Sequence, residues 1–368
     1  MKRFALRMAV FWTACAVVCG IMPTASAVDT SAHSAILMDA ASGRVLYEEN
    51  ADDRSLIAST TKIMTALVVC EQCNVLDRVQ IMPEAVGIEG SSMYLQAGEV
   101  LTVQELLYGL MLHSGNDAAI ALAIYCGGTV EGFVGLMNDE AHRLGLTNTH
   151  FENPNGLDQE HHYSTARDLA MLTAYAMENP VFAKTVSTKT VRVGERYLTN
   201  HNKLLWRCEG VDGGKTGYTK AAGRILVSTA LRNGRRLVAV TIHDPDDWRD
   251  HEKMLDFGFS RYETKPLITE GQGIGTLEVL SDRTQTVELL AGKDFSYPIA
   301  EGETWEVHLS GPGFVYAPVE AGKEAGIAHI LLDGKPIGKI PVYWSRSVEF
   351  TAREEKPNWF QRIFGENG

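Results

Sequence analysis

Two residues near position 60 have the types and the spacing that acyl transfer requires. Ser59 is followed three positions later by Lys62, at the start of an apolar stretch that predicts a buried helix. Positions i and i+3 lie on one face of a helix, so the Lys62 amine can reach the Ser59 hydroxyl. A serine hydroxyl is a good nucleophile only when a base takes its proton, and a lysine can do that only when it is neutral. The pair is compatible with a serine nucleophile and a lysine base, but on this motif alone a serine N-cap before an ordinary helix lysine is the more common arrangement.

Two further motifs change that balance. Ser114-Gly115-Asn116 lies between two predicted helices, where a turn can present both polar side chains to a cleft. Lys215-Thr216-Gly217 falls in a predicted strand, and Gly217 would let a ligand approach the backbone closely. Each motif alone is compatible with a polar loop or a solvated lysine. Their order along the chain is specific, because S-x-x-K, S-x-N and K-T-G occur together in penicillin-binding proteins and class A β-lactamases.

The chain resembles the serine D-Ala-D-Ala carboxypeptidases, which are low-molecular-mass penicillin-binding proteins. The similarity includes Asn153-Pro154-Asn155-Gly156-Leu157 and the segment from Tyr163 to Leu169, and it covers about residues 30–262. It implies an enzyme that removes the terminal D-alanine from peptidoglycan stem pentapeptides ending in D-Ala-D-Ala, through an acyl-enzyme. It also implies covalent inhibition by β-lactams, and we expect neither a cofactor nor a metal.

The resemblance assigns catalytic roles to four residues. Ser59 would attack the carbonyl of the penultimate D-alanine, and Lys62 would take its proton. Ser114 would pass a proton to the leaving D-alanine, and Asn116 would hold the substrate amide. Since lysine has an ordinary pKa of about 10.4, Lys62 must be strongly shifted to act near pH 7.

The third motif supplies the expected substrate-binding residues. Lys215 would attract the terminal carboxylate of the substrate, Thr216 would hydrogen-bond it, and Gly217 would let the substrate lie against the strand. A charged Lys215 would also lower the pKa of Lys62. The resemblance further implies an oxyanion hole formed by the backbone N–H groups of Ser59 and Tyr218.

The rival enzymes are a β-lactamase and a DD-endopeptidase on the same fold, and the rival from another class is a wall-binding sensor that acylates without turnover. Gly115 stands where the β-lactamase motif has Asp, and no glutamate falls in a recognisable deacylation motif. A β-lactamase needs a base that activates water to clear its acyl-enzyme. The sequence therefore favours a carboxypeptidase that β-lactams inhibit.

Three other groups of residues are weaker candidates. Arg249 could bind the terminal carboxylate or could be a surface arginine. His161-His162 suggests a metal site, but histidines in a loop are more often solvated. Cys70 and Cys73 form a C-x-x-C pair that is better explained by buried thiols, with a disulfide as the alternative in an exported protein.

The order of predicted elements indicates an α+β fold. A β-hairpin at the start, a helical middle and an antiparallel pair around Asn233-Gly234 predict a penicillin-binding/β-lactamase-like transpeptidase domain, an antiparallel sheet packed with helices. From Thr185 onward the pattern predicts strands, and after Thr264 only short β segments recur. We expect a small all-β, sandwich-like second domain there. The expected divisions are a signal peptide at 1–27, the carboxypeptidase domain at 28–262, the β domain at 263–352 and an amphipathic tail at 353–368.

Composition and the chain ends indicate export. The first 27 residues have a basic start, an apolar run and Ala25-Ser26-Ala27, which fits a signal-peptide cleavage site. Removing them changes the net charge from −12 to −15, because they contain three basic and no acidic residues. Such a charge argues against nucleic acid as a partner. At the other end, Trp359, Phe360, Ile363 and Phe364 can share one helical face, which predicts a peripheral contact with the outer face of the cytoplasmic membrane.

Overall fold

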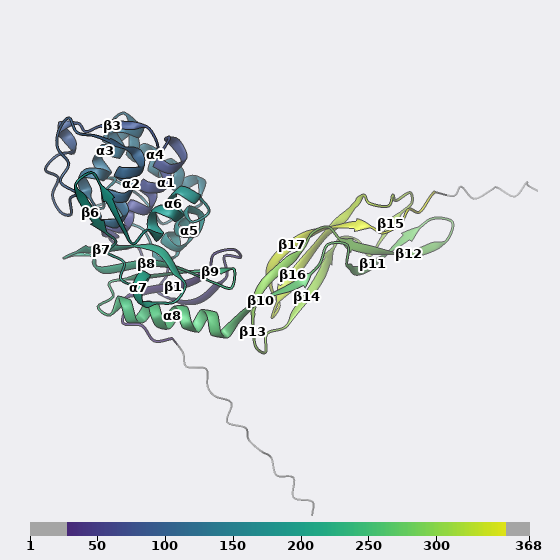
Figure 1. Cartoon of the computed structure of the whole chain (residues 1–368). Helices are drawn as coiled ribbons and strands as arrows, with labels where there is room; N and C mark the ends of the chain where they lie inside the picture. Colours follow the sequence, from purple (N-terminus) through teal and green to yellow (C-terminus); the bar gives the residue numbers. More distant parts are fainter. Residues whose placement is uncertain (1–27, 351–368) are drawn as a thin grey trace, which may run out of the picture.

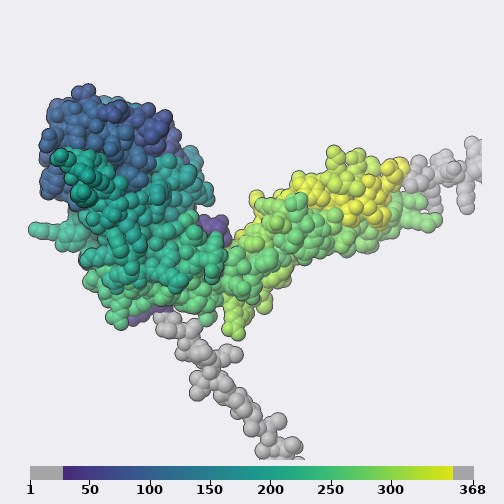
Figure 2. Space-filling view, in the orientation of Figure 1, coloured from purple at the N-terminus to yellow at the C-terminus, as the bar shows by residue number. Residues whose placement is uncertain are grey.

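The computed structural model describes residues 28–350, which form two bodies joined end to end (Figure 1). The first contains the helices and a five-stranded sheet, and the second contains only strands. The space-filling view shows the second body extending from the first as a narrower arm (Figure 2). The predicted signal peptide and the amphipathic tail lie outside the described residues.

The sheet of the first body is antiparallel throughout. Asn233 and Gly234 close one of its hairpins with φ values of 51° and 78°, which confirms the predicted turn. The Lys215 motif lies on β7, the strand at one edge of this sheet, where a ligand can approach from the open side. In spatial order the strands are β2 (Val45–Glu49), β1 (Ser34–Asp39), β9 (Arg235–Ile242), β8 (Gly223–Arg232) and β7 (Val211–Thr219).

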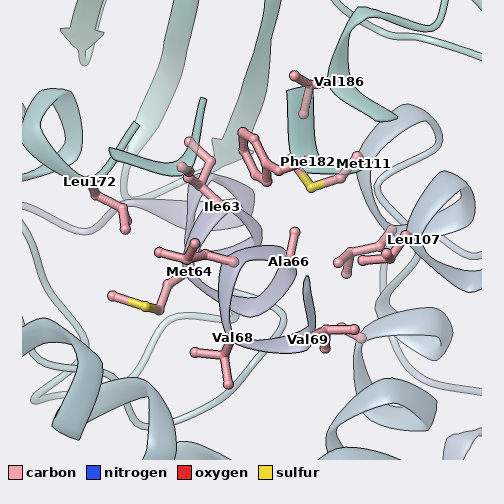
Figure 3. Close-up of a cluster of buried hydrophobic side chains, with 14 of the residues drawn as sticks. Ile63, Met64, Ala66, Val68, Val69, Leu107, Met111, Leu172, Phe182 and Val186 are labelled. Carbon is pink, nitrogen blue, oxygen red and sulfur yellow. The ribbon is translucent and has the colours of Figure 1, made fainter. Parts of the chain in front are cut away.

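Helix α1 lies at the centre of the helical region. Every residue from Lys62 to Val69 is buried, so this helix has no solvent face along its first two turns. Ile63 and Met64 contribute to the core beside side chains from neighbouring helices (Figure 3). Full burial of one such side chain stabilises the fold by about 1.5–3 kcal/mol. The helices of this body are α1 (Lys62–Gln72), α2 (Val103–Leu112), α3 (Asn116–Gly127), α4 (Val130–Arg143), α5 (Ala166–Ala176), α6 (Pro180–Ser187), α7 (Leu204–Arg207) and α8 (Asp247–Arg261).

Capping side chains fix where several of these helices begin. Thr102 and Glu105 form a capping box at α2, in which Thr102 Oγ1 accepts from Glu105 N at 3.2 Å and Glu105 Oε2 accepts from Thr102 N at 2.7 Å. Thr165 caps α5 by accepting from Asp168 N at 3.0 Å. The prediction that strands begin at Thr185 is wrong, because Asn179 caps α6 and Pro180 occupies its first position. Two short pairings of the first body, β3 (Arg78–Gln80) with β4 (Val100–Thr102) and β5 (Thr190–Val193) with β6 (Arg196–Thr199), lie outside the main sheet.

Across residues 28–350 no single helix is both long and apolar enough to cross a membrane. Helices α3 and α4 pass that test of length and composition only when taken together, with a bend of 84° between them. Both are packed into the first body, where Leu122, Phe133 and Met137 are buried.

The second body confirms the expected all-β architecture. Its six-stranded sheet is built from the short β segments expected after Thr264, and Asp333 and Gly334 form the hairpin turn between its last two strands. Two strands were not expected, β10 (Tyr262–Ile268) and β13 (Phe295–Ala300), which pair with each other beside α8. The sheet strands are β11 (Gly273–Leu280), β12 (Thr284–Ala291), β14 (Trp305–Ser310), β15 (Phe314–Tyr316), β16 (Glu324–Leu332) and β17 (Lys335–Trp344).

An arginine of the first body contacts the second. Arg44, in the turn between β1 and β2, donates to both Glu303 carboxylate oxygens and to the carbonyl of Pro298. Its guanidinium also lies over the rings of Tyr262 and Tyr297, 4.9 and 5.4 Å from their centres. Charge, hydrogen bonds and aromatic contacts therefore meet at one side chain where the two bodies join.

The four cysteines of the described residues are free thiols. Cys70, Cys73, Cys126 and Cys208 are each half-buried, and Cys70 and Cys73 are not joined. Burial raises the pKa of the Cys70 thiol to about 12, so this sulfur stays protonated at neutral pH. A protonated thiol is a poor nucleophile and a poor metal ligand, so Cys70 is an unreactive thiol, half-buried where the sequence predicted full burial.

Candidate active site

Ser59 lies in a single 3₁₀ turn, Ala58–Thr61, directly before α1. The expected α-helical first turn is replaced by this tighter one, which begins with Ala58 at a φ of +45°. Two threonines close the turn: Thr60 Oγ1 donates to Ile57 O at 2.6 Å, and Thr61 Oγ1 donates to Ala58 O at 2.8 Å. A non-glycine residue at positive φ is strained. The nucleophile candidate therefore follows a strained residue that side chains hold in place.

Lys62 is fully buried, and its amine has three oxygen partners. Its Nζ lies 2.9 Å from Ser59 Oγ, 2.7 Å from Asn116 Oδ1 and 2.5 Å from the carbonyl of Asn155. A neutral amine has two protons and one lone pair. The two carbonyl-type oxygens can only accept, so they take the two protons, and the lone pair is left for the Ser59 hydroxyl. The geometry therefore matches a base that receives the proton of Ser59.

The surroundings of Lys62 favour its neutral form. Burial lowers its pKa well below the ordinary value, and the nearby Lys215 lowers it further, while the Asp117 carboxylate opposes the shift. Lys215 is buried too, and burial lowers its pKa to about 7. The lowered pKa of Lys62 is the shift that the sequence analysis requires for this lysine to act as a base near pH 7.

The other two motifs meet across the cavity. Ser114, at a φ of +60° in the turn between α2 and α3, has its Oγ 3.0 Å from Lys215 Nζ. Lys215 also donates to the carbonyl of Thr216 at 2.7 Å. Ser114 thus forms a hydrogen-bonded pair with Lys215, while Asn116, two residues further along the chain, forms one with Lys62.

Asn116 is bonded on both sides of its amide. Oδ1 accepts from Lys62, and Nδ2 donates to the carbonyl of Glu89 at 2.6 Å. The neighbouring Asp117 accepts from Ser92 Oγ and from the backbone N–H groups of Met93 and Leu95, at 2.6–3.0 Å. The start of α3 therefore fixes the loop that borders the site.

A cavity of about 620 Å³ opens at Ser59. The cavity is lined by Ser59, Ser114 and Thr216. Behind these lining residues lie the buried side chains of Lys62, Asn116 and Lys215. Its lining residues are Ser59, Ser91, Ser114, His201, Thr216, Gly217, Tyr218, Arg224, Ile225, Asp247 and Trp248.

The arginine of the cavity is Arg224 and not Arg249. Arg224 is bound to Asp247 by two hydrogen bonds and lies 5.8 Å from the centre of the Trp248 ring. Arg249 is 71% exposed and lies 3.8 Å from Asp246, outside the lining. Sequence reasoning missed Arg224 because it lies on β8, seven residues after Gly217. Its presence here depends on the pairing of β8 with β7.

His162 is buried, which contradicts the prediction of solvated loop histidines at this position. Its Nε2 lies 2.7 Å from Thr61 Oγ1, and its Nδ1 accepts from Glu152 N at 3.1 Å. Only His161 is exposed. Both nitrogens of His162 are therefore used in protein hydrogen bonds directly beneath the Ser59 turn.

Strand β7 passes close to the nucleophile. A side chain at Gly217 would lie 3.1 Å from the carbonyl of Ile57 and 3.4 Å from the nitrogen of Ser59. The glycine thus permits the approach of the strand edge to the turn. Ser59 N, among residues 28–350, has no intramolecular acceptor, and it lies beside the strand that carries Tyr218.

A buried lysine pair, a serine between helices and sheet, and a cavity along the edge strand define a serine acyl-transfer enzyme. Comparison with known proteins specifies which one. The profile of the D-alanyl-D-alanine carboxypeptidase family matches residues 22–246, and that of the C-terminal domain of penicillin-binding protein 5 matches residues 262–349. The chain belongs to the D-alanyl-D-alanine carboxypeptidase family, which confirms the resemblance stated from its motifs.

Relatives match along most of the chain. D-alanyl-D-alanine carboxypeptidase DacF of Bacillus subtilis is 35% identical over 327 residues, covering 84% of both chains. DacC of Escherichia coli is 36% identical over 346 residues, covering 89% of this chain and 86% of DacC. Among solved structures, penicillin-binding protein 5 of Haemophilus influenzae superposes with a TM-score of 0.76 at 33% identity, covering 87% of this chain and 98% of that one. The predicted fold class and enzyme class are confirmed.

Proposed function

We propose that this chain removes the terminal D-alanine from peptidoglycan stem pentapeptides, with Ser59 as nucleophile and Lys62 as its base. The observation that supports this assignment best is the 2.9 Å contact between Ser59 Oγ and the buried Lys62 amine. Serine carboxypeptidase activity is that of the family to which the chain belongs. The roles of individual residues rest on the geometry.

Acylation begins when Ser59 Oγ attacks the carbonyl carbon of the penultimate D-alanine. Its proton passes to the lone pair of Lys62, which becomes an ammonium with three protons. Asn116 Oδ1 and the Asn155 carbonyl already accept two of them, and the third points to the oxygen of Ser59. We assign Asn116 the role of orienting Lys62, since its amide is engaged on both sides.

The negative charge that develops on the carbonyl oxygen needs donors. We assign this role to the N–H groups of Ser59 and Tyr218, because both residues line the cavity and Ser59 N lies close to Gly217 of β7. Removing one oxyanion donor costs about 3–4 kcal/mol in other serine hydrolases. The leaving D-alanine amine then takes a proton, for which Ser114 is placed between the cavity and Lys215.

The substrate carboxylate has cationic and hydroxyl partners on one wall. Thr216 and Arg224 line the cavity, and Lys215 lies just behind Thr216. A carboxylate placed there leaves the scissile bond over Ser59. Arg224 is already bonded to Asp247, so it contributes less free charge than Lys215.

β-Lactams fit the same site as slow substrates. Opening the lactam ring leaves the amine attached to the acyl group, so the leaving group stays where water must enter. Asp247 is the one carboxylate of the cavity lining, and it is bonded to Arg224. A paired carboxylate is a poor general base for water. This observation favours a β-lactam-inhibited carboxypeptidase over a β-lactamase.

The decisive experiment incubates the protein with a stem pentapeptide and follows D-alanine release together with the mass of the Ser59 peptide. Ser59→Ala should abolish both D-alanine release and penicillin labelling, while Ser281→Ala, at a half-buried serine between β11 and β12 of the second body, should leave both unchanged. Penicillin labelling without D-alanine release would indicate a sensor. Fast hydrolysis of a chromogenic cephalosporin would indicate a β-lactamase.

Relatives of this chain are penicillin-binding proteins, so we place its action outside the cytoplasm, on the cell wall. Residues 1–27 would direct export. Trp359, Phe360 and Ile363, with Arg362, would give a weak contact with anionic lipid. Vesicle co-sedimentation of the chain with and without residues 353–368 tests this contact, and equal partitioning of the two forms would exclude it.

A further inference from the structure

We propose that His162 is a positioning residue for the oxyanion hole, because it orients and polarises the Ser59 N–H group through Thr61. This inference rests on the proposed function, in which that N–H group binds the oxyanion. His162 lies on the loop that follows Asn155 and does not line the cavity. Its action is therefore indirect.

Two independent hydrogen bonds fix the tautomer of His162. The backbone N–H of Glu152 donates to Nδ1 at 3.1 Å, so Nδ1 carries no proton. Thr61 Oγ1 donates its single proton to Ala58 O at 2.8 Å, so it can only accept from His162 Nε2 at 2.7 Å. Both arguments give a neutral ring with the proton on Nε2.

The surroundings hold the ring neutral and immobile. His162 is 1% exposed, and the Phe151 ring lies edge-on to it with centres 5.8 Å apart. Burial lowers the pKa of His162 to about 4. The ring thus keeps one proton and one orientation across the neutral range.

The series of hydrogen bonds from His162 through Thr61 ends at the peptide bond between Ala58 and Ser59. Its carbonyl accepts from Thr61, and its N–H is the proposed oxyanion donor. In a trans peptide the carbonyl and the N–H point in opposite directions, so fixing one fixes the other. Hydrogen bonds in series polarise one another, so donation to this carbonyl also strengthens the N–H as a donor.

Ala58 is the residue that needs such support. Its φ of +45° is strained for a residue with a side chain, and no N-cap side chain bonds the turn. Gly156 presses on the same carbonyl, because a side chain there would lie 1.9 Å from Ala58 O. Thr61 and Gly156 therefore both contact the Ala58 carbonyl and hold it in place.

Matched substitutions separate this role from general packing. Gln places a donor where His162 has Nε2, whereas Asn places an acceptor where it has Nδ1. We expect His162→Asn to lower the rate at which a β-lactam acylates Ser59 about 10–100-fold, with little change in substrate KM. His162→Gln should keep most of the wild-type acylation rate. Thr61→Val should resemble His162→Asn, and Thr61→Ser should resemble the wild type. Equal rates for the Asn and Gln variants at equal thermal stability would overturn the proposal.

A spectroscopic measurement tests the wild-type chain directly. Long-range ¹H–¹⁵N correlation on ¹⁵N-histidine-labelled protein assigns the His162 ring as the signal that disappears in His162→Gln. We expect that signal to be a neutral ring with its proton on Nε2. A proton on Nδ1 would overturn the inference. Neither the rate of acylation by a β-lactam nor the tautomer of His162 requires the peptide substrate. Absence of D-alanine release would therefore disprove the proposed function, while these two measurements would still decide this inference.

Discussion

At the scale of single residues, the protonation state of Lys62 controls the chemistry. Three oxygens surround its amine, two of which can only accept, and the surrounding protein removes water from it. An amine in this setting is a base at neutral pH because its charged form loses hydration and faces the positive charge of Lys215. The side chain must therefore both reach Ser59 and lose its proton near neutral pH.

Lys62→Arg separates these two requirements. Arginine keeps the positive charge but does not deprotonate near neutral pH. We expect acylation by penicillin to fall by about 10²–10⁴-fold, as for loss of a general base. Stopped-flow or mass-spectrometric acylation rates measure it, with circular dichroism as the control for folding. A well-folded variant with a near-normal rate would show that another group is the base.

Lys215→Met tests the electrostatic coupling. Lys62 acts when neutral, so the acylation rate falls as the pH drops through the pKa of Lys62. Since the charge of Lys215 lowers that pKa, its removal should raise it and move the acid limb of the rate profile to higher pH. Lys184→Met, at an exposed position of α6, is the matched control. An acid limb that stays in place in Lys215→Met would show that burial alone sets the pKa of Lys62.

Some site residues could be predicted from the sequence and others could not. Ser59 and Lys62 are three positions apart on one helical turn, so local geometry reveals them. The Asn155 carbonyl is a backbone atom, which any residue type supplies, so no side-chain pattern marks it. Arg224 and His162 reach the site through strand pairing and loop packing, and their partners lie at positions distant in sequence.

At the scale of elements, the site depends on how closely β7 and the loop after α4 approach the Ser59 turn. Gly217 admits the strand on one side, and Gly156, at a φ of +87°, admits the loop on the other. The same loop presents the Asn155 carbonyl to Lys62. A glycine therefore lies at both contacts, that of β7 and that of the loop, with the Ser59 turn.

Gly156→Ala tests the loop contact. An added methyl group would lie 1.9 Å from the Ala58 carbonyl, and the positive φ adds strain. We expect a loss of about 1–3 kcal/mol of unfolding free energy and a lower acylation rate, because the Ser59 turn must shift. Gly135→Ala, on α4 with no atom near the new methyl group, is the control and should keep its activity. Wild-type acylation by Gly156→Ala would show that the turn tolerates displacement.

Elements with strong periodicity or caps were predictable, and those set by competing signals were not. Val181, Thr185 and Val186 favour a strand by composition, yet Asn179 and Pro180 begin a helix there. Strands β10 and β13 contain Pro266 and Pro298, which weaken the strand pattern. They pair as a separate two-stranded sheet, where missing N–H groups are tolerated.

At the scale of the whole molecule, a narrow all-β arm extends from the catalytic body (Figure 2). No lining residue of the cavity comes from the arm. The residues that line the cavity therefore all belong to the catalytic body. Arg44 is the side chain at the junction where ionic, hydrogen-bond and aromatic contacts coincide.

Arg44→Ala should loosen this junction without harming the chemistry. It leaves Glu303 half-buried and unpaired and removes the contact with the Tyr262 and Tyr297 rings, which together should weaken the junction by about 1–3 kcal/mol. We expect a broader distance distribution in small-angle X-ray scattering and faster proteolysis near Tyr262, with unchanged D-alanine release from a soluble pentapeptide. Arg346→Ala, at an exposed arginine of the arm, is the control. Identical scattering and proteolysis for Arg44→Ala and the wild type would show that the strand pairing of β10 with β13 and the end of α8 hold the arm without this arginine.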